Sequence, residues 1–137
     1  MATYNRIDIT TDGQLEEHAV DLIVTPGEFV ARTATGVGLP GAGEQVGLVV
    51  LEDFFQGKTI DDDYASGDNA RCLSVKKGDI IWAWLTDEQN ITAGDELEVA
   101  ATGRLVVANT GDVVAVAQES LNLTGAAGDA RLLVRIA

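Results

Sequence analysis

Short apolar runs bounded by glycine, aspartate or asparagine recur along this chain. Runs of this kind, separated by turn residues, are typical of strands in an all-β protein. No stretch repeats its apolar residues at helical spacing over a convincing length. The best helical candidate is a short turn at Ile60–Ala65, with Thr59 or Asp61 as its N-cap. The chain contains 15 glycines but only 2 prolines, which favours many tight turns. We therefore expect an all-β fold.

The alternating segments predict where the strands lie. Pro26-Gly27 fits the centre of a type II turn, and Lys77-Gly78-Asp79 places glycine where a tight hairpin needs it. The architecture expected is a small β-barrel or sandwich (β-tulip-like) with long loops and little helix. The expected strands are Tyr4–Thr10, Asp21–Val24, Phe29–Thr33, Gln45–Leu51, Ala70–Val75, Ile80–Thr86, Glu96–Val99, Arg104–Val107, Val113–Ala117 and Ala130–Ile136.

A chain of 137 residues is long enough to bury a core without disulfides. We expect residues 12–137 to form a single β domain. Residues 1–11 are polar and are expected to form an N-terminal arm that orders only on a partner, so that its removal leaves the fold intact. Residues 36–43 are rich in glycine and proline and are expected to form a mobile surface loop.

The charge of the chain limits its partners. Its 22 acidic residues against 9 basic ones give a net charge of −13, which argues against binding to nucleic acid. No apolar run approaches the length of a membrane helix and no signal peptide is recognisable, so neither membrane contact nor secretion is expected. The acidity suits either an ordinary soluble surface or adaptation to high salt, where self-repulsion is screened.

The residue types that usually carry catalysis are sparse. His18 is the only histidine and Cys72 the only cysteine, so a zinc site lacks ligands and Cys72 is expected to be a small buried hydrophobe. Asp61-Asp62-Asp63 does not reproduce the ligand spacing of a calcium loop. We therefore expect no enzyme activity, no metal and no cofactor.

The segment Ile80–Leu85 is apolar on both of its faces, because its side chains alternate between the two sides of a strand. Such a strand is buried on both sides, either as ordinary core or at a subunit interface. Ile81, Trp82 and Trp84 are accordingly candidates for an oligomer interface, with the core as the other interpretation.

The connector between the expected strands Gln45–Leu51 and Ala70–Val75 combines aromatic residues with glycines and aspartates. This composition indicates a shaped surface feature without catalytic groups. It belongs to a series of segments that resembles the decoration, or cement, proteins on the heads of tailed double-stranded DNA viruses, over roughly Glu44–Ala137. The resembling segments are LEDFFQGKTIDDDYASGD, VKKGDIIWAWL, ITAGDELEVAATGRLVV, VVAVAQESLNL and ARLLVRIA.

The resemblance implies a small β-rich body, no catalysis and the clamping of neighbouring capsid subunits. The function expected is a structural virion protein that binds the outer surface of the major capsid protein lattice and stabilises the expanded head. It would be made in the host cytoplasm, in a virus of a halophilic, archaeal or bacterial host. The other partner expected is the chain itself, as a homotrimer in preference to a dimer. The alternative is a small carbohydrate- or ligand-binding β module of a virion or cell surface. The candidate capsid contacts are Tyr4, Asn5, Arg6, Phe54, Phe55, Lys58 and Tyr64.

Overall fold

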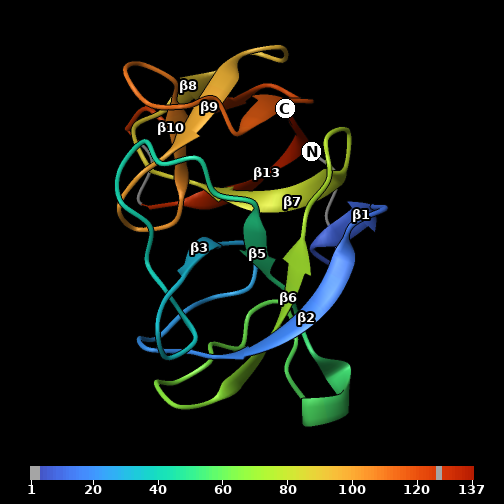
Figure 1. Ribbon diagram of the computed structural model, residues 1–137. Helices are drawn as coiled ribbons and strands as arrows, with labels where there is room; N and C mark the ends of the chain where they lie inside the picture. The colour runs from blue at the N-terminus through green and yellow to red at the C-terminus, as the bar shows by residue number, and fades with distance from the viewer. Residues whose placement is uncertain (1–3, 126–127) are drawn as a thin grey trace.

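The computed structural model describes residues 4–125 and 128–137, and its regular structure is almost entirely strand. The strands form two lobes that are stacked on one another in Figure 1. The first lobe, at the top of the view, contains most of the second half of the chain. The second lobe lies below it and contains most of the first half. The all-β fold expected from the sequence is confirmed.

The first lobe is a barrel. Its six-stranded sheet has a first and a last strand, yet β13 also pairs with β7, so five of the six strands close on themselves. A separate two-stranded sheet joins β8 (Asn90–Ile91) to β12 (Leu121–Asn122). In order across the large sheet, the strands are β1 (Asp8–Thr10), β7 (Ile80–Leu85), β10 (Leu105–Val107), β9 (Glu96–Val99), β11 (Ala115–Ala117) and β13 (Ala130–Ile136).

The second lobe is a curled sheet whose five strands are all antiparallel to their neighbours. A parallel bridge between Val20 and Val37 connects its two outer strands and completes the curl. A short 3-10 helix, η1 (Phe54–Gln56), projects from the loop between β5 and β6. The order of the strands is β2 (Gln14–Ala19), β6 (Asn69–Ser74), β5 (Leu48–Val50), β3 (Phe29–Arg32) and β4 (Val37–Gly38).

The two lobes share one apolar core. Phe29 and Leu73 of the second lobe belong to the same buried cluster as Ile81 and Leu132 of the first lobe. A smaller cluster fills the curl of the second lobe alone and includes Cys72. Because the larger cluster draws on both lobes, separating them would expose apolar surface on each, which disfavours independent motion.

Several strand predictions need correction. The strands β2, β4, β8 and β12 were not expected, and β4 lies inside the segment predicted to be a mobile loop. The segment Asp21–Val24 is not a strand, since only Val24 forms an isolated bridge, to Tyr64. The helical turn occurs in η1 instead of at Ile60–Ala65. The glycines and alanines of residues 122–129 also predict a turn before the last strand, but residues 126 and 127 lie outside the described residues.

The N-terminal segment is part of the body from Tyr4 onward, so the prediction of a free arm is wrong for the described part of residues 1–11. Ile7 is completely buried. The backbone N–H of Trp82 donates to the carbonyl oxygen of Ile7 at 2.9 Å. The Tyr4 ring meets the Trp82 ring edge-on, with centroids 5.4 Å apart. Residues 1–3 lie outside the described residues.

We expect Ile7→Ala to lower the free energy of unfolding by about 2–5 kcal/mol, the usual cost of truncating a fully buried isoleucine. Deleting residues 1–11 should cost more, because it also removes β1 from its pairing with β7. Urea denaturation monitored by circular dichroism measures both changes. A truncated protein that unfolds at the same urea concentration as the full chain would show that β1 adds nothing to stability.

Candidate functional site

A few large apolar side chains remain exposed in this otherwise polar surface. Phe55 is fully exposed and Phe54 is 57% exposed, and both lie on η1. Isolated exposed apolar residues are ordinary, whereas two adjacent exposed phenylalanines are not. The exposed large apolar residues of the described chain are Leu15, Leu22, Ile23, Leu39, Phe54, Phe55 and Val107.

The loop that carries the two phenylalanines is fixed by its own hydrogen bonds. Asp53 caps η1, because its Oδ1 accepts the backbone N–H of Phe55 at 3.1 Å. Its Oδ2 accepts from the side-chain amide of Gln56 at 2.7 Å. The backbones of Asp53 and Lys58 exchange two hydrogen bonds of 2.9 Å across the base of the loop. Gly57 ends the helix with a φ of 75°, which glycine adopts without strain. Both rings are therefore held out by a closed, capped loop.

Two hollows flank Phe55. One, of ≈ 360 Å³, lies toward β2, and the other, of ≈ 220 Å³, lies toward the N-terminal segment. Phe55, Asp53 and Arg71 line both of them. We call the two hollows and the rings between them the Phe55 surface. Its lining residues are Arg6, Leu15, Glu16, Glu17, Glu52, Asp53, Phe54, Phe55 and Arg71.

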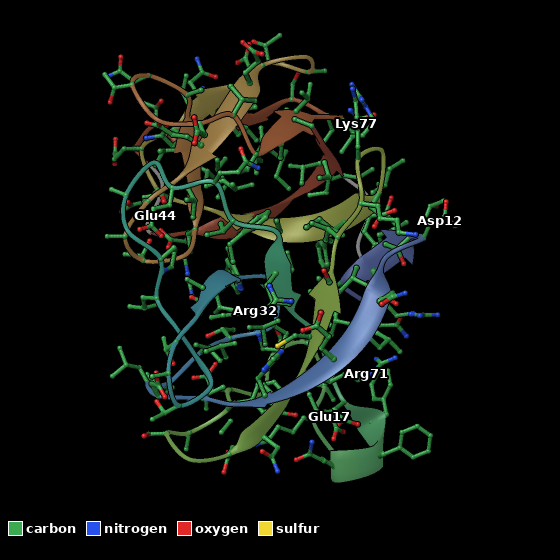
Figure 2. All side chains as sticks on the ribbon, viewed as in Figure 1. Asp12, Glu17, Arg32, Glu44, Arg71 and Lys77 are labelled. Atoms are coloured by element: carbon green, nitrogen blue, oxygen red, sulfur yellow. The ribbon has the colours of Figure 1, made fainter. Side chains whose placement is uncertain are left out.

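Charged groups of both signs surround the rings. Figure 2 shows Glu17 and Arg71 close together above η1, where they are direct partners across β2 and β6. Arg71 donates to the backbone oxygen of Glu52 at 3.3 Å, and no carboxylate of the described residues lies within ion-pair distance of it. Aromatic residues and arginine are enriched in the buried centres of protein interfaces. Phe54, Phe55 and Arg71 are of these types, whereas the acidic residues of the same surface, Glu16, Glu17, Glu52 and Asp53, are of types that interfaces contain less often.

The structure places the expected capsid contacts in different settings. Arg6, Phe54 and Phe55 come together on the Phe55 surface. Asn5 is exposed beside them in sequence, and Tyr4 is half-buried against Trp82. Lys58 is half-buried, and its ammonium donates to the backbone oxygen of Asp63 at 3.0 Å.

Tyr64 is not available as a contact, so that prediction is wrong. Its side chain is fully buried in the small core of the second lobe, and its hydroxyl donates to the Leu51 oxygen at 2.8 Å. Burial raises the pKa of Tyr64 to about 12. The ring therefore supports the loop from inside instead of offering surface to a partner.

The predicted oligomer interface is also covered within the chain. Ile81 is fully buried in the shared core and Trp82 is nearly so, and neither can reach a second subunit. Trp84 is half-buried, and its indole N–H donates to the backbone oxygen of Pro26 at 2.9 Å. The guanidinium carbons of Arg104 and Arg131 each lie 4.3 Å from its ring centroid. The apolar faces of β7 are thus satisfied by the barrel interior and by cationic side chains.

Sequence reasoning missed six members of the site: Leu15, Glu16, Glu17, Glu52, Asp53 and Arg71. Leu15 lies on β2, whose polar sequence gave no strand signal. Glu52 and Arg71 flank the connector, and their burial or exposure depends on how the loop folds back. The one available signal in the sequence was the acidic pair Glu52-Asp53 directly before two phenylalanines.

The histidine has an ordinary structural partner, and the acidic residues do not form a metal site in the described part of the chain. His18 lies 2.7 Å from Glu16, and the pKa of Glu16 is lowered by this hydrogen bond and by Arg32. Within residues 4–125 and 128–137, no group of three or more His, Cys, Asp or Glu side chains is arranged to hold a metal ion. The helices of that same part of the chain include none long and apolar enough to cross a membrane.

Cys72 should be inert in the folded protein. It is fully buried, and burial raises the pKa of its thiol to about 12. Because the thiolate is the reactive form, we expect iodoacetamide to alkylate the native thiol roughly a thousandfold more slowly than the urea-unfolded thiol at pH 8. Mass spectrometry of timed samples measures both rates. Comparable rates would show that the small core of the second lobe opens readily.

Comparison with known proteins supplies a structural relative only. No protein-family model matches the chain, and no curated protein sequence matches it either. Among solved structures, the fold is similar to the N base of the head fiber protein gp8.5 of bacteriophage phi29, with a TM-score of 0.60 and 11% sequence identity. The match covers 90% of this chain and 93% of that one. The two proteins therefore share a fold over nearly their whole lengths.

Proposed function

We propose that this chain is a structural protein of a tailed-virus particle. In this proposal it binds the outer surface of the major capsid protein lattice and stabilises the expanded head. The observation that carries the proposal is the fold, which is similar to that of a head fiber base over 90% of this chain and 93% of the relative. The resemblance of residues 44–137 to capsid decoration proteins points to the same part of a virus.

The Phe55 surface is the attachment site in this proposal. Residues at the centre of an interface supply most of its binding energy when they are large and enter a desolvated pocket. Phe54 and Phe55 are already held outward by the capped loop, so little conformational entropy is lost when they bind. Arg71, which lacks a carboxylate partner among the described residues, adds a polar group that can pair with the capsid surface.

Attachment through several copies would strengthen a weak single contact, because linked contacts act at high effective concentration. We propose a homotrimer, which matches the symmetry of a threefold junction. Since β7 is covered, the interface between the subunits of this trimer would use the exposed Leu22, Ile23 and Leu39. The Asp21 N–H donates to the Val37 oxygen at 2.9 Å, which brings these residues to one end of the second lobe. Light scattering should give three copies; a monomer, both free and on capsids, would contradict the trimer.

The carbohydrate-binding alternative required an exposed platform formed by Trp82 or Trp84. Trp82 is buried under the N-terminal segment and Trp84 lies between two arginines. No observation in the described structure favours that alternative.

Sedimentation with heads tests the proposal. The purified chain would be mixed with expanded and with unexpanded heads, both assembled from the major capsid protein of the same virus. We expect saturable binding to the expanded heads and a higher melting temperature for the decorated heads. Failure to bind expanded heads at micromolar concentration, with the protein shown to be folded, would overturn the proposal.

A further inference from the structure

A buried carboxylate lies directly beneath the Phe55 surface. Glu52 is 1% exposed and lines the smaller hollow. Its Oε1 accepts the Ile7 N–H at 3.2 Å, which ties the N-terminal segment to the second lobe. Its Oε2 is buried and has no hydrogen-bond partner among the described residues. An ionised carboxylate with an unpaired buried oxygen is costly, because the charge has lost its water and gained no replacement.

A second carboxylate approaches from the N-terminal segment. Asp8 pairs with Arg6, whose Nη2 lies 3.0 Å from Asp8 Oδ2, while Asp8 Oδ1 is buried without a partner among the described residues. The Nε of the same arginine is 4.0 Å from Glu52 Oε1. One guanidinium, with a side chain 58% exposed, therefore serves two carboxylates, of which Glu52 is buried and Asp8 is partly buried. With both ionised, Arg6 alone would face two negative charges.

The other charged groups around Glu52 do not remove this excess. Arg71 favours ionisation of Glu52, but it donates to the backbone oxygen of that residue. Burial, followed by repulsion from Asp8, raises the pKa of Glu52. These effects outweigh the hydrogen bonds from the backbone of Glu52 itself and from Ile7, and the attraction of Arg71. Asp53, the next residue, is occupied in capping η1, and the Tyr64 hydroxyl and Arg131 are the other groups whose ionisation is coupled to that of Glu52.

We propose that Glu52 is a proton-operated latch on the N-terminal segment. Neutral Glu52 holds Arg6–Thr10 against the body, and ionised Glu52 favours the release of that segment. Release would carry Arg6 away from the smaller hollow, which Arg6 lines, and would thereby change the Phe55 surface. The latch concerns the folding of the segment; its effect on docking rests on the function proposed above.

The direction of the pH dependence follows from linkage. With the segment closed, the pKa of Glu52 is raised, whereas with the segment released it returns to the ordinary value of about 4.3. The closed form therefore binds the proton more tightly, so closure is favoured at low pH. The open fraction should rise as pH increases from the ordinary to the raised pKa, by at most about tenfold per pH unit, and then level off.

Hydrogen exchange measured by NMR on the full-length free protein tests the latch. We expect the opening equilibrium of the Ile7 amide, corrected for intrinsic exchange, to rise with pH in the wild type. In Glu52→Gln it should be low and independent of pH, because the amide carries no charge. Glu96→Gln is the matched control, because Glu96 is an exposed glutamate on β9 of the first lobe, away from this surface, and it should behave as wild type. Opening that is independent of pH in the wild type would overturn the latch.

Two further measurements cover the case in which Glu52→Gln fails to fold. A carboxyl ¹³C titration of the wild type should place the Glu52 pKa above the ordinary range, and Asp8→Asn should lower it. An ordinary Glu52 pKa in the wild type, or no change in Asp8→Asn, would contradict the proposal. Binding to expanded heads across the same pH range is a separate readout. Absence of binding at every pH would refute the proposed function, while the exchange data would still decide the latch.

Discussion

Replacing Phe55 with alanine should weaken attachment to expanded heads by about 2 kcal/mol or more, which is about thirtyfold in the dissociation constant. The fully exposed ring makes little contribution to the free chain, so the free energy of unfolding should change by less than about 0.5 kcal/mol. The loss should arise because the ring enters a pocket on the capsid and both surfaces lose water there. Titration of heads with labelled protein gives the dissociation constant, and urea denaturation gives the stability.

Val107→Ala is the matched control for this substitution. Val107 is also an exposed apolar residue, but it lies on β10 of the first lobe, away from η1. It should bind heads as the wild type does. Equal binding by wild type and Phe55→Ala, or an equal loss in Val107→Ala, would show that attachment does not depend on the Phe55 surface.

Arg131→Ala should be strongly destabilising, because it leaves the buried backbone oxygens of Pro26 and Ile60 without the donor that Arg131 supplies, at about 1–3 kcal/mol for each group left unsatisfied. Arg131 extends from β13 toward the connector after η1 and is nearly buried. Its Nη1 donates to Asp61 Oδ1 at 3.1 Å. Its Nη2 donates to the backbone oxygens of Pro26 and Ile60. The guanidinium also lies against Trp84. Urea denaturation measures the change.

Two other variants of β13 make this test specific. Arg131→Lys should recover only part of the stability, since an ammonium keeps the charge but lacks the planar fork that reaches several acceptors. Arg135→Ala is the control, because Arg135 is half-buried on the same strand and forms no ion pair with any described residue. A loss below about 1 kcal/mol in Arg131→Ala would mean that the network contributes little to holding the lobes together.

The strands of the barrel could be predicted because their side chains alternate and glycine turns separate them. The expected limits of Glu96–Val99 and Ala130–Ile136 agree with β9 and β13. The strand β2 could not be predicted, since QLEEHA is polar on both faces and pairs only along one edge with β6. The two residues of β4 are a strand only because β3 lies beside them. Such pairing depends on the tertiary fold.

The candidate site was predicted in part for the same reason. Phe54 and Phe55 lie in a loop capped by nearby residues, so their display depends on local sequence. The burial of Tyr64 depends on a bridge to Val24, forty positions earlier in the chain. Covering Trp84 likewise requires Arg131 from the last strand. Neither long-range contact leaves a signal near the aromatic residue, and both therefore needed the structure.

The central claim is that this chain is a component of the virus head. The most direct measurement is the amount of the chain in purified particles, determined by quantitative mass spectrometry relative to the major capsid protein. We predict a fixed ratio to the major capsid protein in intact particles and the same ratio after the genome has been released. Absence from purified particles, while the protein is abundant in the infected cells, would contradict the account.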